Sequence, residues 1–355
     1  MLDDLQLIRK QDRDGMLAIL NRFDKQLEEA LEIGLGTFSV EIIPPVENIL
    51  VCGLGGSASG GDFLQAYLGN SLKIPFLVNR GYSIPGFAGP STLVFVCSYS
   101  GNTEEIISAF QESREAGCQV ICSTSGGQLK ELARQNECPC IQLPEGYPPR
   151  TALGYSSIPL LGVLSRLGVI SDRSEEVRRA IPWVRSCIDR YGEHTPSQDN
   201  PAKNLALQAY RKIPIFYGSQ SRLEMVAVRW RTQFSENAKQ LAYSGVLSEM
   251  NHNEIAGWRH PAAHFQHLLP VFLRDCDDHP RIQLRAEITA KMLKKESGAC
   301  FECWSEGESW LQRLLALMLL GDYASIYLAF LNQEDPTAVE VIDSLKLRLK
   351  DHISS

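Results

Sequence analysis

Short apolar runs alternate with longer amphipathic segments along most of this 355-residue chain. In the first half, runs bounded by Gly, Ser and Pro lie at 49–52, 75–78, 93–96, 120–122 and 140–143. A second series lies at 213–217, 268–273 and 299–304. Strands separated by helix-length segments are typical of βαβ units, whose strands run parallel. The pattern predicts an α/β fold of two units, each a mostly parallel sheet flanked by helices in a three-layer sandwich.

Length supports two units, because single hydrophobic cores stop growing beyond about 250–300 residues. Apolar residues at helical spacing predict an N-terminal helical segment over 1–36. The first α/β unit is expected at 37–170 and the second at 204–335, joined at 171–203 by a polar, proline-containing linker that is helical with a loop. The remaining residues, 336–355, predict a C-terminal helix that packs on the rest of the chain.

The overall charge disfavours nucleic acid and membrane surfaces as partners, because the formal net charge is −7. The N-terminus lacks a signal-like region, and no uninterrupted apolar run reaches about 18 residues. A cytoplasmic location is predicted. The ten cysteines are expected to be reduced core residues. The CxxC pair Cys300 and Cys303 has no second pair to complete a four-thiolate site, so a structural zinc is not expected.

A glycine-rich turn follows the first predicted strand, with five glycines within residues 53–61. Glycines let the backbone approach a ligand closely, and the N-terminus of the following helix favours an anion. Gly53, Gly55 and Ala58 also fit a dinucleotide fingerprint, so an NADP site stays open as an alternative. A P-loop fails because Asp62 stands where lysine is required. A turn without any ligand is the remaining interpretation.

A second polar turn, 98–104, reads Ser-Tyr-Ser-Gly-Asn-Thr-Glu and follows the strand near Cys97. Because the carboxyl ends of parallel strands meet at one edge of a sheet, this turn and the glycine-rich turn are expected to converge on one anion. Hydroxyl groups and helix N–H groups can hold a phosphate without lysine. The alternative is that Thr103 merely caps the next helix, as in a capping box.

These two turns resemble the sugar isomerase (SIS) domain family, whose SxSGxT loop holds sugar phosphates. Four further segments resemble its bifunctional phosphoglucose/phosphomannose isomerase branch in order and spacing, and they lie at 149–155, 235–239, 249–254 and 320–323. The resemblance covers roughly residues 40–350 and implies SIS subdomains at 37–170 and 204–335. It also implies a homodimer with active sites at the interface, a hexose 6-phosphate substrate, and no cofactor or metal.

The implied reaction interconverts glucose 6-phosphate or mannose 6-phosphate with fructose 6-phosphate through an enediolate. Taken alone, Glu236 could be a surface carboxylate and His252 a loop histidine. The resemblance implies instead that Glu236 is the catalytic base, that His252 opens the sugar ring from the neighbouring subunit, and that Arg150 stabilises the enediolate. Lys346 matches a C-terminal lysine that assists at the same end of the sugar. The residues implied in phosphate binding are Gly55, Gly56, Ser57, Ser98, Ser100 and Thr103.

Two rival functions remain open from the residues. His260 and His264 have the i,i+4 spacing of a metal site, but the intervening glutamate of the usual motif is missing. A non-catalytic, SIS-type sensor of sugar phosphates would need only the two polar turns. Ala58 and Ser59 also depart from the usual branch pattern, which has glycine and an aliphatic residue there, so the pocket wall is expected to differ.

Overall fold

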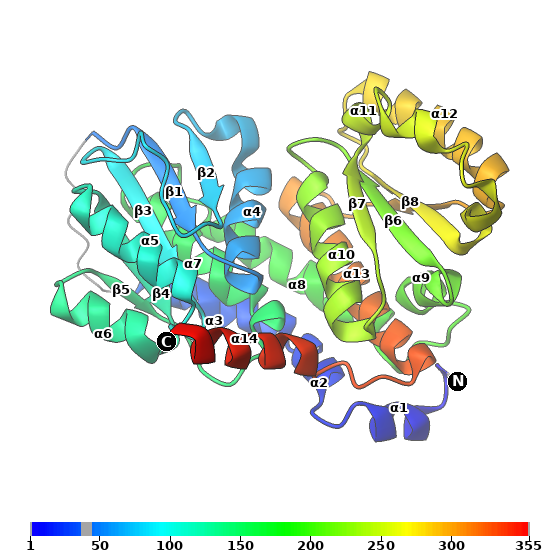
Figure 1. The fold of residues 1–355 in the computed structure, drawn as a ribbon, viewed down its shortest axis with the longest axis horizontal. Coiled ribbons are helices and arrows are strands. Elements are labelled where there is room, and N and C mark those ends of the chain that lie inside the picture. The colour runs from blue at the N-terminus through cyan, green and yellow to red at the C-terminus, as the bar shows by residue number, and fades with distance from the viewer. Residues whose placement is uncertain (1, 37–44, 354–355) are drawn as a thin grey trace.

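The first unit is built on a five-stranded sheet in which every paired strand is parallel (Figure 1). The structure is a computed structural model that describes residues 2–36 and 45–353, so the expected boundary at 36/37 and the last two residues lie outside the described part. The strand order is β2-β1-β3-β4-β5. Their bounds are β1 Asn48–Cys52, β2 Phe76–Asn79, β3 Thr92–Cys97, β4 Gln119–Thr124 and β5 Cys140–Gln142.

Helices cover both faces of this sheet because alternate strand residues point to opposite sides. Val51 and Phe95 belong to one core cluster, whereas Leu50 and Val94 belong to another on the opposite face. The first face carries α3 Phe23–Leu35, α4 Gly56–Leu68 with the short η1 Gly69–Ser71, and α7 Leu153–Arg166. The second carries α5 Glu104–Glu115 and α6 Gly127–Gln135. Three layers result, as the sequence pattern predicts.

The second unit has a four-stranded parallel sheet in the order β7-β6-β8-β9. Its strands are β6 Ile213–Gly218, β7 Tyr243–Val246, β8 Leu268–Arg274 and β9 Phe301–Trp304. One face carries α9 Pro201–Ala209, α10 Glu224–Ala238 and α13 Trp310–Asn332; the other carries α11 Leu247–Met250, η3 Glu254–Gly257, η4 Ala262–His267 and α12 Pro280–Ser297. The sequence pattern missed β7, a four-residue edge strand interrupted by Gly245.

Residues 171–203, expected as a linker, contribute to the protein core. They form α8 Ser174–Tyr191, whose residues Val177, Val184 and Ile188 lie in the same core cluster as α3 and α13. The charged residues that suggested a linker lie on the outward side of this helix, which is amphipathic. One continuous core therefore joins the two units, and α1 Leu5–Gln11 and α2 Met16–Leu20 pack at its edge.

Helix α13 is long and apolar enough to cross a membrane by length and composition, although Arg313 and Asp322 interrupt its apolar run. The apolar window of α13 is 100% buried inside the protein. A core helix passes this test as readily as a membrane helix does, because both are apolar on all sides. Its buried surface is explained by contacts with α9, α10 and α8.

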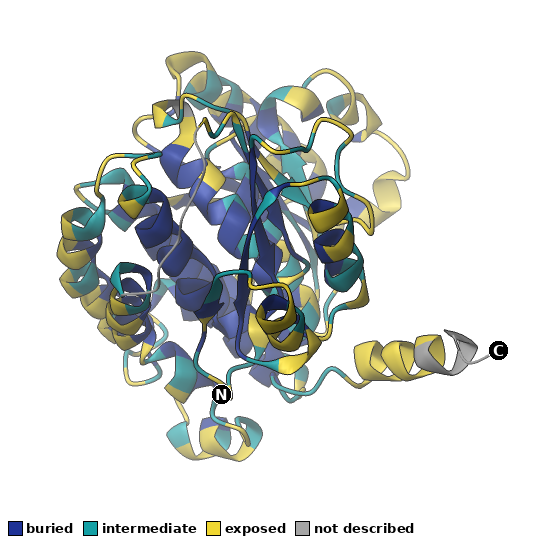
Figure 2. Cartoon of the chain, turned by 90° about the vertical axis from the view of Figure 1, so that its left-hand side faces the viewer, coloured by how far each residue is buried: buried dark blue, intermediate teal, exposed yellow. Residues whose placement is uncertain are grey.

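The C-terminal helix α14, Glu340–Ile353, projects from the body of the chain (Figure 2). The expectation that it packs on the rest of the chain is wrong for a single chain, because Val341, Leu345 and Leu349 are exposed. Amphipathic spacing predicted the helix correctly. Spacing shows only that one face is apolar and does not show which surface covers it.

Candidate active site

The glycine-rich turn leads from β1 into α4 and exposes backbone that a side chain would obstruct. Gly55 has a φ of +52°, and a Cβ there would meet no atom of the described chain within 4 Å. A Cβ at Gly56 would lie 2.2 Å from the carbonyl oxygen of Pro149. Glycine at 55 thus leaves the helix N-terminus open, and glycine at 56 lets the segment containing Pro149 pack directly against α4.

The second turn leads from β3 into α5, with Thr103 at the N-cap position. Among the described residues, the Thr103 side chain makes no capping bond to α5. Its Oγ1 lies 2.9 Å from Oγ of Ser98, which is buried, while Ser100 is exposed and its Oγ accepts from N of Asn102. The capping interpretation is therefore wrong. The first N–H groups of α5 and the hydroxyl groups beside them stay available to an anion.

The two turns touch, as expected for neighbouring parallel strands. β1 and β3 are paired in the sheet, and the backbone N–H of Tyr99 donates to Oγ of Ser57 over 3.1 Å. Ser57 is buried, and this bond leaves its hydroxyl proton free to donate. Two helix N-termini and the hydroxyls of Ser57, Ser98 and Thr103 thus gather at one edge of the first sheet, an arrangement suited to a phosphate group.

Arg150 lies in a short helical turn, η2 Pro149–Thr151, that packs on the N-terminus of α4. The side chain of Arg150 is buried, and its Nη2 donates to the carbonyl oxygens of Pro336 at 2.7 Å and Thr337 at 2.8 Å. Its Nε donates to Oδ1 of Asn237 at 2.7 Å. These three acceptor oxygens, together with the Glu236 carboxylate described next, hold the guanidinium in one orientation beside the glycine-rich turn.

Glu236 approaches Arg150 from α10 of the second unit, with Oε2 of Glu236 3.7 Å from Nη1 of Arg150. The Glu236 side chain is 29% exposed, so a ligand can reach the carboxylate. Burial lowers the pKa of the Arg150 guanidinium, and the charge of Glu236 acts in the opposite direction. The structure therefore brings a partly accessible carboxylate, a buried cation and the glycine-rich turn into one site, at the junction of the two units.

A buried polar network contacts the Arg150–Glu236 pair on its interior side. The sequence analysis assigned no role to the residues of this network. Arg229 on α10 donates to the backbone oxygen of Arg150 at 2.9 Å and to Oδ2 of Asp322 at 2.6 Å. Asn237 donates to Oγ of Ser325, one turn further along α13. Burial raises the pKa of Asp322, and the guanidinium of Arg229 opposes that rise. The signal available in the sequence was a lone aspartate within the apolar run of α13.

The structure does not bring His252 and Lys346 to Glu236 within one chain. His252 is exposed after α11, which lies at the opposite end of β7 from the C-terminus of α10 (Figure 1). The four extended residues of β7 alone span about 13 Å. Lys346 is exposed on the projecting helix α14. Of the four proposed catalytic residues, a single chain therefore unites Arg150 and Glu236.

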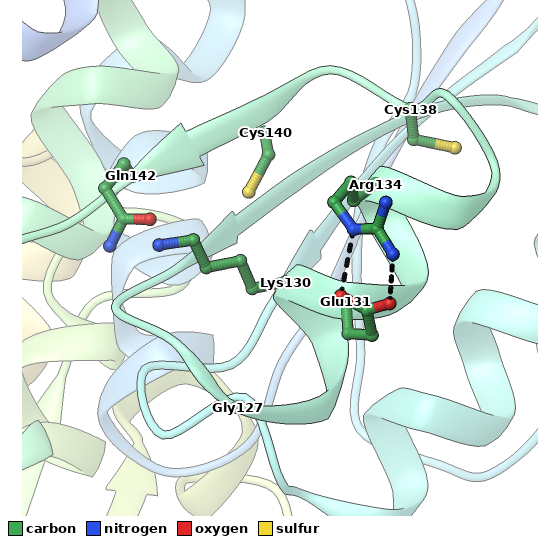
Figure 3. A pocket seen from close by; sticks show the side chains of 7 residues that line it. All are labelled: Gly127, Lys130, Glu131, Arg134, Cys138, Cys140 and Gln142. Atoms are coloured by element: carbon green, nitrogen blue, oxygen red, sulfur yellow. Dashed lines mark hydrogen bonds and ion pairs between the residues drawn. The ribbon is translucent and has the colours of Figure 1, made fainter.

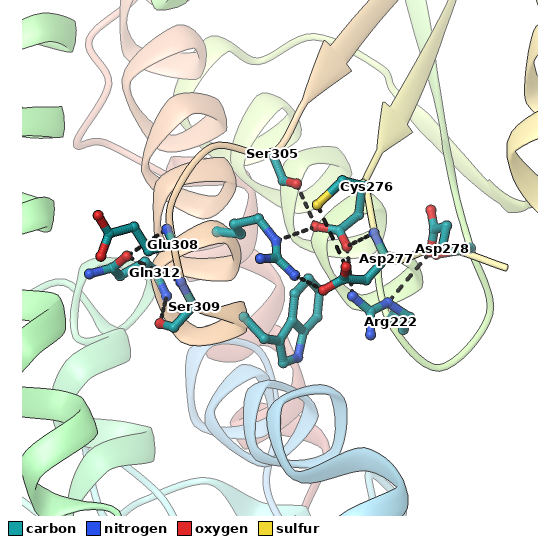
Figure 4. Close-up of polar contacts among 12 residues, drawn as sticks. Arg222, Cys276, Asp277, Asp278, Ser305, Glu308, Ser309 and Gln312 are labelled. Atoms are coloured by element: carbon teal, nitrogen blue, oxygen red, sulfur yellow. Dashed lines mark hydrogen bonds and ion pairs between the residues drawn. The ribbon is translucent and has the colours of Figure 1, made fainter. Parts of the chain in front are cut away.

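One cluster of described residues has the ligand types of a metal site, and arginines pair with its carboxylates (Figure 4). The ligand atoms of Asp275, Cys276 and Asp277 lie within 4.8 Å of one another. Arg222 donates to Asp275 over 2.7 Å, and Arg313 pairs with both aspartates. Arginine side chains occupy the lone pairs that a cation would need. This cluster is explained as an ion-pair network between β8 and α13.

A groove of about 400 Å³ lies beside the second turn, between α6 and β5 (Figure 3). It is bordered by Gly127, Cys138 and Cys140, and by Arg134, which is paired with Glu131 on the same helix. Arg134 and Glu131 are both well exposed, and burial raises the pKa of both thiols, which keeps them protonated. Neither the two thiols nor the Arg134–Glu131 pair therefore gives this groove a reactive group for the site at the junction.

Comparisons with known proteins show which family and which fold this chain resembles. Residues 198–349 match the model of the bacterial phospho-glucose isomerase C-terminal SIS domain. The chain is 40% identical to a bifunctional phosphoglucose/phosphomannose isomerase of Caldicellulosiruptor bescii, over 92% of this chain and 96% of that one. It is 36% identical to the protein of the same description from Aquifex aeolicus, over 87% of this chain and 92% of the relative.

Among solved structures, a hypothetical protein from Thermus thermophilus superimposes with a TM-score of 0.76, covering 99% of this chain and 94% of that one. Its sequence identity is 16%, so it supports the fold alone. The full-length relatives carry the assignment further, because the similarity extends over both units and the residues between them. The chain belongs to the bifunctional phosphoglucose/phosphomannose isomerase family.

Proposed function

We propose that this protein is an aldose–ketose isomerase that interconverts glucose 6-phosphate and mannose 6-phosphate with fructose 6-phosphate. The observation that carries the proposal is the ion pair of Arg150 and Glu236 beside two phosphate-binding turns. The turns hold the phosphate of an open-chain sugar and leave its carbonyl end beside the carboxylate. The enzyme acts in the cytoplasm, in keeping with its composition.

The chemistry assigned to the site is a proton shuttle. The Glu236 carboxylate removes the proton from C2 of the aldose, which gives an enediolate, and the carboxyl group then returns that proton to C1. The hydroxyl proton on O2 passes to O1 in the same interconversion, which leaves the carbonyl at C2. Arg150 stabilises the negative oxygen that forms in between, because its charge is already oriented by Asn237 and two carbonyls. Glucose and mannose forms differ only at C2 and give the same enediolate, so one base serves both.

A coupled assay of fructose 6-phosphate formation tests the proposal directly. Each aldose is supplied in turn, with a chelator present throughout. We expect turnover with both aldoses, because the proton transfer is assigned to Glu236 rather than to a metal-bound group. Absence of turnover on both, with sugar phosphate still bound, would favour the sensor function instead.

Replacing Thr103 by valine tests the phosphate-binding turns. The change removes one hydroxyl of the Ser98–Thr103 pair and keeps the shape of the side chain. A lost hydrogen bond to a charged phosphate is expected to raise KM about tenfold or more, with a smaller change in kcat because the phosphate is remote from the bond that changes. Thr195→Val, on the loop after α8, is the control. Equal KM values in both variants would contradict the assignment.

A homodimer with shared sites is part of the proposal, because His252 lies away from Glu236 in its own chain. His252 of a second copy then supplies the imidazole that exchanges protons at the ring oxygen. Lys346 is assigned to the end of the sugar at which His252 acts.

Mixing two inactive variants tests whether the sites are shared. A dimer of one Glu236→Gln chain and one His252→Ala chain contains one intact site, made of Glu236 from one subunit and His252 from the other. After dissociation and random reassociation, about a quarter of wild-type activity is expected to return. Each variant alone stays inactive. If the mixture stays inactive while mixed dimers form, His252 serves its own chain and the shared-site proposal fails.

A further inference from the structure

Helix α14 presents an apolar face that its own chain leaves uncovered. Val341 is 85% exposed, Leu345 58% and Leu349 50%. Positions 341, 345 and 349 are four residues apart, so they line one side of the helix, and Ile342 lies beside them. Leu347 is also exposed but points to the other side, beside Asp343 and Ser344. An apolar stripe of this length on a helix that projects from the body requires a partner surface.

The direction of α14 is set at the active site. Carbonyl oxygens of Pro336 and Thr337 accept hydrogen bonds from Arg150, and Lys239 donates to the carbonyl oxygen of Asp335. The chain is therefore held at the edge of the site immediately before the helix begins. The N-terminal end of α14, and whatever surface covers it, therefore lies close to that site.

Under the proposed function, the second unit of another copy lies at this place, because it must deliver His252 to the site. On that unit the segment around His252 is tied to α12, since Nδ2 of Asn251 donates to Oγ1 of Thr289 at 2.9 Å. Helix α12 carries an exposed apolar stripe of its own, with Leu284 42%, Ile288 49% and Met292 48% exposed. These three residues are also four positions apart, so the exposed stripe on α12 has the same length as the one on α14. A shared site would bring these two surfaces together.

We propose that α14 of each subunit crosses to the second copy and packs its apolar stripe on α12 of that copy, beside the segment that carries His252. The inference rests on the proposed function, because the shared site places these surfaces together. A stable interface usually contains about 20–30 residues on each side. Helix α14 supplies 14 residues, which is fewer than that. The α11–η3 segment around His252 adds the remainder, so α14 acts as a strap that holds the partner's histidine in place.

Paired leucine variants on α14 test the docking. Leu345→Glu combined with Leu349→Glu places charges in the stripe, whereas Leu347→Glu places one on the opposite side of the same helix. Glutamate is a good helix former, so neither variant is expected to unfold α14. Sedimentation of the full chain over a range of concentrations measures the dimer dissociation constant. We expect a rise of at least about tenfold for the double variant and little change for Leu347→Glu.

A rescue variant identifies the receiving surface. Ile288→Lys on α12, combined with the glutamates on α14, puts opposite charges across the proposed contact and is expected to restore part of the dimer affinity. An unchanged dissociation constant for the double leucine variant, an equal loss for Leu347→Glu, or absence of rescue would overturn the docking. Sedimentation needs no substrate. A dimeric wild-type chain that converts neither aldose would therefore overturn the isomerase proposal and leave this one standing.

Discussion

Replacement of Glu236 by glutamine is expected to lower kcat for both aldoses by about 10²–10⁴-fold, the range typical for loss of a general base. Glutamine keeps the size of the side chain, but it carries no charge and cannot take a proton. The phosphate-binding turns are untouched, so KM and the inhibition by a non-reacting sugar phosphate are expected to change little. Steady-state kinetics of fructose 6-phosphate formation measure both quantities.

Glu224→Gln provides a matched control for this variant, because Glu224 lies in the first turn of the same helix. The Glu224 carboxylate is at the opposite end of α10 from Arg150. The kcat of the Glu224→Gln variant is therefore expected to match that of the wild type. Two results would contradict the role of Glu236: activity within a few fold of the wild type, or a loss of sugar phosphate binding equal to the loss of turnover. The second result would make Glu236 a binding group rather than a base.

Replacement of Asp322 by leucine is expected to cost about 3–5 kcal/mol of the free energy of unfolding. Asp322 is buried on α13, and its carboxylate accepts from Arg229 through two hydrogen bonds and from Gln233 through a third. Leucine would leave the guanidinium of Arg229 buried without a counter-charge. Denaturant unfolding measures the change, and Asp322→Asn, which keeps one acceptor for Arg229, is expected to fall between leucine and the wild type.

Asp277→Asn is the control for a carboxylate paired with arginine near the surface. The Asp277 side chain is 62% exposed and pairs with Arg313. Solvent screens such a pair, so Asp277→Asn is expected to lower the free energy of unfolding by about 1 kcal/mol or less. If Asp322→Leu unfolded at the same denaturant concentration as Asp277→Asn, the buried network would not be a main contributor to the junction of the two units.

The sequence supported the layered α/β fold because alternation between apolar runs and helix-length segments reflects local burial. It also placed the two polar turns together, since the carboxyl ends of neighbouring parallel strands must meet at one edge. Its errors came where local pattern is ambiguous. The edge strand β7 is too short to stand out, and the apolar stripe of α14, which was expected to pack on the rest of the chain, stays exposed.

The residues alone therefore determined the period of most elements, the parallel sheets and the meeting of the two polar turns at one edge, because these depend on neighbours in the chain or in the sheet. Only the tertiary structure decided that Arg150 meets Asn237, 87 residues away, and lies against Glu236. It also decided that Asp322 supports them and that the apolar face of α14 stays uncovered by its own chain. Contacts between distant buried polar groups depend on how the two units pack, and hydrophobic periodicity contains no information about which of those groups meet.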